Sequence, residues 1–61
     1  MTEDEVSSLT KGTRINHTTL GDGTVADTRG PEGDRRLVAD FDECGQKELL
    51  IAFAHSRVSL L

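Results

Sequence analysis

Apolar and polar residues alternate along most of the chain, and short glycine-rich or polar segments interrupt this alternation. Strict alternation sends every second side chain to one face, which is typical of β-strands that bury that face. The alternation predicts five strands, over residues 14–17, 23–28, 36–41, 46–51 and 57–61. The six glycines interrupt every longer candidate helix, and only residues 52–56 are expected to form a helical turn. The sequence therefore predicts an all-β chain.

Turn-forming residues separate the predicted strands. We interpret Gly21-Asp22-Gly23 as the turn of the first hairpin, because glycine reaches positive φ angles at little steric cost. Segments 29–35 and 42–45 form the next two reversals. Five short strands joined in this way indicate a small closed barrel or meander, whose closure would hide the strand edges. Its core is expected to contain Ile15, Leu20, Val25, Leu37, Ala39, Phe41, Leu49, Ile51, Phe53, Ala54 and Val58.

The first ten residues are polar and acidic, with Val6 and Leu9 as the only apolar side chains after Met1. A segment this short does not hold a helix by itself. We therefore predict a flexible, disordered acidic arm over residues 1–10 and a folded domain over residues 11–61. Three of the eleven acids lie in the arm, which leaves eight acids against seven Lys and Arg in the domain. A nucleic-acid binder usually shows a basic excess, and this domain has none.

No residue pattern supports a catalytic, metal or cofactor site. A nucleophilic thiolate needs cationic neighbours, whereas Cys44, the single cysteine, follows Asp42 and Glu43. Zinc needs three or four ligands, and His17 and His55 lie far apart in the sequence. We expect His17 to pack at the edge of the barrel and to bond the backbone through a ring nitrogen. The sequence therefore predicts a protein that is not an enzyme and binds no cofactor.

Two further function classes are excluded by composition. No apolar run approaches the about 20 residues that span a bilayer, and the acidic N-terminus lacks the core of a signal peptide. The expected compartment is the cytoplasm, without membrane contact. Phe41 and Phe53 are the only aromatic residues, which is too few for an aromatic cage that reads methyl-lysine.

Several short motifs occur in a characteristic order. Gly12-x-Arg14-Ile15-x-His17 is followed by Leu20-Gly21-x-Gly23-x-Val25, then by Ala39-Asp40-Phe41, Gly45-Gln46-Lys47-Glu48-Leu49 and Phe53-Ala54. This order resembles the C-terminal Tudor-like (SH3-like) domain of UvrD/PcrA-type DNA helicases, over roughly residues 11–58. The opening motif also resembles RNA-polymerase-interacting domains of the CarD and transcription-repair-coupling type. The resemblance implies a five-stranded SH3-like barrel that occurs here without a helicase motor, as a free-standing small protein.

The resemblance further implies a non-enzymatic docking module that binds RNA polymerase or a complex of transcription and DNA repair. The residues expected to contact the partner are Asp22, Thr24, Arg29, Arg35, Arg36 and Lys47. The arginines flank one loop, where they can pair with an acidic partner, contact phosphates or remain solvated. The alternative function is therefore a small barrel that binds nucleic acid directly through this loop. The expected oligomeric state is a monomer or a weak homodimer.

Overall fold

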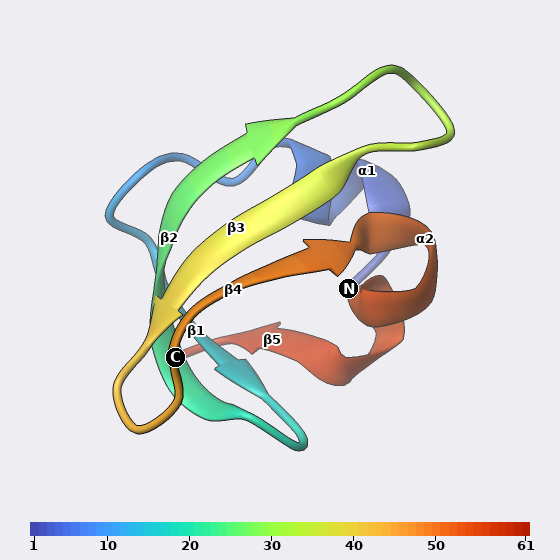
Figure 1. The fold of residues 1–61 in the computed structure, drawn as a ribbon. Coiled ribbons are helices and arrows are strands. Elements are labelled where there is room, and N and C mark those ends of the chain that lie inside the picture. The colour runs from blue at the N-terminus through green and yellow to red at the C-terminus, as the bar shows by residue number, and fades with distance from the viewer.

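The computed structural model describes residues 1–61 and is built around one antiparallel five-stranded sheet (Figure 1). The strands are β1 (Arg14–His17), β2 (Gly21–Arg29), β3 (Arg36–Phe41), β4 (Gly45–Leu50) and β5 (Val58–Leu60). The helical elements are α1 (Glu3–Ser7), α2 (Ile51–Ala54) and the 3-10 helix η1 (His55–Arg57). Every strand begins and ends within two residues of its predicted position. The predicted all-β, SH3-like architecture is confirmed.

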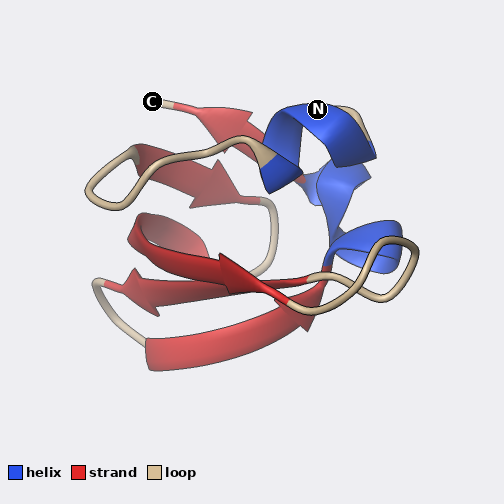
Figure 2. Cartoon of the chain, turned by 90° about the horizontal axis from the view of Figure 1, so that it is seen from above, coloured by secondary structure: helices blue, strands red, loops and turns tan.

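The sheet curls strongly but does not close, which corrects the expectation of a closed barrel. Its strand order is β4-β3-β2-β1-β5, so β4 pairs only with β3 and β5 pairs only with β1. Between these two edge strands the chain passes through α2 and η1 (Figures 1 and 2). Residues in a helix form their backbone hydrogen bonds within the helix, so α2 and η1 cannot connect the edges of β4 and β5 by strand pairing. None of the helices is long and apolar enough to cross a membrane.

The core lies inside the curl of the sheet. Its buried cluster consists of Val6, Ile15, Val25, Leu37, Ala39, Phe41, Ile51 and Val58. Leu20 and Leu49 are only partly buried and pack against this cluster, and Ala54 is buried as predicted. The prediction for Phe53 is wrong, because its side chain is 77% exposed. Helix α2 turns Ile51 and Ala54 inward, and the rotation of about 100° per residue carries Phe53 outward.

Residues 3–7 form a helix where the sequence predicted a flexible arm. Thr2 caps this helix through its side chain, which accepts a hydrogen bond from the backbone of Glu5. The Glu5 carboxylate accepts in return from the Thr2 N–H at 2.8 Å, which completes a capping box. Val6 is fully buried in the core cluster. Tertiary packing thus supplies the stability that so short a helix lacks by itself.

The turn of the first hairpin lies three residues earlier than predicted. His17 pairs with Gly21 across β1 and β2, so the turn consists of Thr18, Thr19 and Leu20. Gly21 follows with a φ of 85°, a conformation that favours glycine. The Nδ1 atom of His17 accepts hydrogen bonds from the N–H groups of Thr19 and Leu20, at 3.0 and 3.1 Å. The predicted backbone bond of His17 is confirmed, and it holds a turn whose sequence lacks glycine.

Candidate functional site

Two of the predicted contact residues meet on the outer face of the sheet. Arg29 of β2 and Arg36 of β3 lie opposite each other in the strand register. Both bind the carboxylate of Glu48 on β4, at 3.3 Å from Arg29 and 2.9 Å from Arg36. The hydrogen bond between Arg36 and Glu48 raises the pKa of the guanidinium and lowers the pKa of the carboxylate. Two cations therefore share one anion, and about half of each guanidinium-bearing side chain is exposed.

Arg35 does not join this pair. Its Nη1 donates to the carbonyl oxygen of Gly30 at 3.0 Å, and its Nη2 donates to Oγ1 of Thr28 at 3.2 Å. These bonds fold the side chain back onto the loop between β2 and β3. Gly30 permits this tight loop, because its φ is 100° and a Cβ atom there would lie 2.7 Å from the Asp34 carbonyl oxygen. Arg35 therefore has a structural role in the loop, and the arginines do not form one cluster of three.

Asp22 and Thr24 lie at the far end of β2, within a second polar cluster. Asn16 donates from Nδ2 to the Asp22 carboxylate at 2.9 Å. Arg14 donates to Oγ1 of Thr24 at 2.8 Å and to both carboxylate oxygens of Asp42, at 3.0 and 2.8 Å. The forked bond to Asp42 raises the pKa of Arg14 and lowers the pKa of Asp42. Neither Arg14 nor Asp42 was among the predicted contact residues, because 28 positions separate them in the sequence and only the fold brings them together.

Lys47 stands apart from both clusters. It lies on the edge strand β4, opposite Ala39 in the register, and it is exposed. It forms no ion pair within 4.0 Å. The six predicted contact residues thus occupy four places on the surface, and only Arg29 and Arg36 act as a unit.

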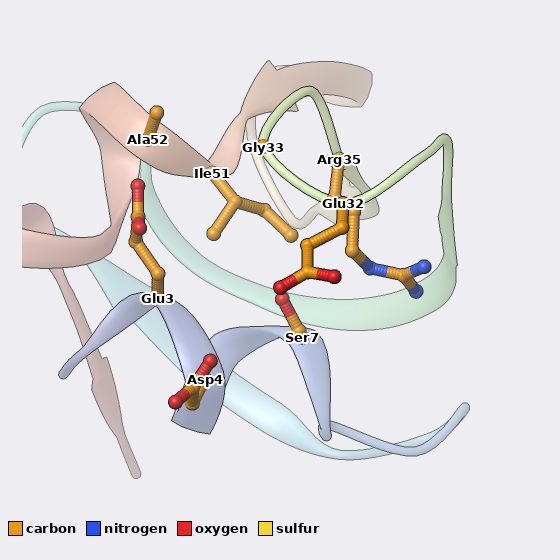
Figure 3. A pocket seen from close by; sticks show the side chains of 8 residues that line it. All are labelled: Glu3, Asp4, Ser7, Glu32, Gly33, Arg35, Ile51 and Ala52. Atoms are coloured by element: carbon orange, nitrogen blue, oxygen red, sulfur yellow. The ribbon is translucent and has the colours of Figure 1, made fainter.

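A groove that the sequence did not reveal runs between α1, α2 and the β2–β3 loop, with a volume of about 440 Å³ (Figure 3). Ile51 and Ala52 form its apolar part, and its acidic side chains are Glu3, Asp4 and Glu32. None of these carboxylates forms an ion pair. The Arg35 guanidinium points away from Glu3 and Asp4 (Figure 3). Three distant segments build this groove, so no local motif could have indicated it.

No group of three His, Cys, Asp or Glu side chains is placed to hold a metal ion. Cys44 is exposed and forms no disulfide, and it lies in the turn between β3 and β4. His55 is engaged by the backbone, since its Nδ1 lies 2.9 Å from the carbonyl oxygen of Met1.

Comparison with known families matches residues 12–55 to the PcrA/UvrD tudor domain. The matched span contains β1 to β4 together with α2, and it leaves out α1 and β5. No curated protein matches the chain. The match confirms the resemblance drawn from the motif order. It concerns the small accessory domain of these proteins and not their helicase catalytic domain, and it indicates a protein-interaction module.

Proposed function

The chain belongs to the PcrA/UvrD tudor domain family, and from this premise we propose that it is a non-enzymatic docking module for RNA polymerase or for a complex of transcription and DNA repair. Family membership over residues 12–55 is the observation that carries the proposal. The module acts in the cytoplasm, as an adaptor, a regulator or a competitor of other proteins that dock at the same place.

The arginine pair on the outer sheet face supports this proposal. Arg29 and Arg36 use only part of their guanidinium groups on Glu48, and a guanidinium carries five N–H donors in a fixed fork. The unused donors can bind a carboxylate of a partner. These two arginines form the proposed polar contact area for the partner. Lys47 lies on the neighbouring strand β4 but alternates to the other sheet face, opposite Ala39, so its contact with a partner is a separate proposal.

Direct binding of nucleic acid remains the competing function for the same arginines. It is the weaker candidate because non-specific phosphate binding depends on a broad basic excess, whereas residues 11–61 carry eight acids against seven Lys and Arg. Phosphate binding releases counterions, so its affinity falls steeply with salt. Docking through a partly apolar surface depends less on salt. The two functions therefore differ in a property that is simple to measure.

The test measures retention of purified RNA polymerase, and separately of a DNA duplex, on the immobilised chain at two salt concentrations. We expect the polymerase to be retained at both, with affinity about tenfold lower for the double variant Arg29→Gln, Arg36→Gln. Lys11→Gln is the matched control, because Lys11 is an exposed cation outside all three ion pairs. Retention of the duplex alone, with a steep salt dependence, would reverse the assignment.

A further inference from the structure

Phe53 is the most exposed large apolar side chain of the protein, and its exposure is 77%. The only other aromatic residue, Phe41, is 2% exposed and belongs to the core. Helix α2 fixes the direction of Phe53, because Ile51 and Ala54 must face inward. With about 100° per residue, Phe53 lies about 200° around the helix from Ile51. It therefore faces away from Ile51, while Ala52, the other apolar residue of the acidic groove, lies about 100° from it around the helix.

Leu50 extends this apolar surface toward the sheet. It is the N-cap residue of α2, and Phe53 occupies the N3 position. Side chains at these two positions lie on the same side of a helix start, which is the geometry that lets a capping box form. Leu50 is half-buried and stands opposite Arg36 in the register of β3 and β4. Figure 1 shows α2 directly after the end of β4, beside this corner of the sheet.

Four side chains thus follow one another across this corner. Arg29 and Arg36 face each other across β2 and β3, Leu50 is the next residue in the row, and Phe53 lies beyond it. An aromatic side chain that is desolvated by a partner is a typical energetic centre of an interface. An arginine beside it supplies directional donors for a carboxylate. The corner therefore combines an apolar contact with a site for one negative charge.

We propose that Phe53 and Leu50 are the apolar anchor of the docking surface, and that this surface binds a segment of a partner protein in which a large apolar side chain neighbours a carboxylate. The inference rests on the proposed docking function and specifies the chemistry of its partner. The apolar side chain packs on Phe53 and Leu50. The carboxylate binds the guanidinium donors of Arg36 and Arg29 that Glu48 leaves unused.

Charge argues against a basic occupant of this surface. A basic segment would place its cations against Arg29 and Arg36, and like charges at an interface oppose binding. An acidic and apolar partner segment avoids this conflict. A second copy of the chain is the competing occupant, because a two-fold interface lets different parts of the same patch face each other, and self-association in the titration below would identify it.

The test is an NMR titration of the ¹⁵N-labelled full chain with three synthetic peptides of equal length. The first carries Leu and Phe beside Asp and Glu, the second carries the same apolar residues beside Lys, and the third carries the acids beside Ala. We expect only the first peptide to shift the amides of Leu50, Phe53 and Arg36. Phe53→Ala should weaken its binding at least about 30-fold, the loss typical of an interface centre.

Two controls keep the result interpretable. Phe53 is largely exposed, so Phe53→Ala should keep the native amide spectrum, which the same measurement records. Leu61→Ala removes a side chain of similar exposure, 64%, at the C-terminus, which Figure 1 shows on the side of the molecule away from α2. This variant should leave the affinity unchanged. The inference is overturned if Phe53→Ala binds the first peptide as the original chain does. It is also overturned if the Lys peptide binds this corner, or if the corner instead causes self-association that rises with concentration.

The experiments separate a failure of the apolar anchor from a failure of the proposed docking function. If the original chain and the Phe53→Ala variant retain RNA polymerase equally well, the apolar anchor is wrong and the docking function stands. If the acidic peptide binds at Phe53 but polymerase and repair factors are not retained, the anchor stands and the named partner is wrong.

Discussion

His17 and Phe41 meet edge to face inside the curl of the sheet, with ring centroids 6.1 Å apart and ring planes inclined at 80°. The imidazole is 7% exposed, and its Nδ1 accepts the hydrogen bonds that hold the first turn. An Nδ1 atom that accepts cannot also carry a proton. Burial, together with the nearby charge of Arg57, lowers the pKa of His17 below its ordinary value of 6.5.

Acid should destabilise the protein through His17. The folded state holds this pKa below 6.5, so the unfolded chain binds the proton more readily than the native one. The contribution of His17 to the free energy of unfolding is therefore fully present at pH values above its pKa in the unfolded chain. This contribution falls as the pH drops below about 6.5. Thermal unfolding followed by circular dichroism should show a lower Tm at pH 5.5 than at pH 7.5. In His17→Asn, whose amide does not titrate, this part of the pH dependence should vanish; an unchanged slope would contradict the assignment.

Gly23→Ala should destabilise the fold by about 1–3 kcal/mol, the usual range for overpacking a core. Gly23 is a buried strand residue, and a Cβ atom there would lie 2.7 Å from Cδ1 of Phe41 and 3.0 Å from the Asp40 carbonyl oxygen. Urea unfolding of the two proteins measures the difference. The same substitution should cost less in a Phe41→Leu background, where the conflicting ring atom is gone. Equal costs in both backgrounds would show that the ring is not the obstacle.

Val6→Ala should reduce the free energy of unfolding by about 2 kcal/mol, because it removes buried methyl groups from the core. A flexible arm would give no such loss, so the experiment tests whether α1 belongs to the folded unit. Ser8→Ala changes an exposed residue of the same segment and should alter the stability by less than about 0.5 kcal/mol. Chemical denaturation of both variants decides between the helix and the arm.

Glu48→Gln should tighten the binding of the acidic peptide about threefold, because the carboxylate that occupies the arginine pair is removed. Asp27→Asn is a matched control. Asp27 on β2 and Glu48 on β4 both pair with Val38 of β3, one from each side. Asp27 carries the same charge as Glu48 but forms no ion pair with an arginine. If both variants tighten binding equally, the gain reflects net charge only. A larger gain for Glu48→Gln identifies the arginine pair as the receptor of the partner's carboxylate.

Alternation along the sequence was sufficient to predict the strands. In β3 the alternate residues Leu37, Ala39 and Phe41 are buried as predicted, and Val38 on the other face is buried as well. Alternation cannot show where a helical turn rotates out of the core, and Phe53 was misplaced for that reason. Val6 was missed because its burial depends on a helix that only tertiary contacts stabilise.

The candidate surface was less predictable than the fold. Proximity in sequence suggested one cluster of three arginines, but Arg35 is drawn back by Gly30 and Thr28. Glu48, which organises the other two, lies 12 positions from Arg36. The strand register brings Arg29, Arg36 and Glu48 together, and this register depends on the exact lengths of the turns. The Gly-Asp-Gly motif shows the difficulty, because the actual turn precedes it and relies on His17.

The unpaired edge of β4 bears on the self-association of the chain at high concentration. An open edge is a template on which another strand can add. If two copies of β4 pair antiparallel about Lys47, two ammonium groups lie directly opposite each other, and pairing about Glu48 opposes two carboxylates. Like charges in directly opposite positions destabilise a strand pair. The sequence of β4 thus disfavours these two registers of self-pairing, while a foreign strand with other charges meets no such barrier.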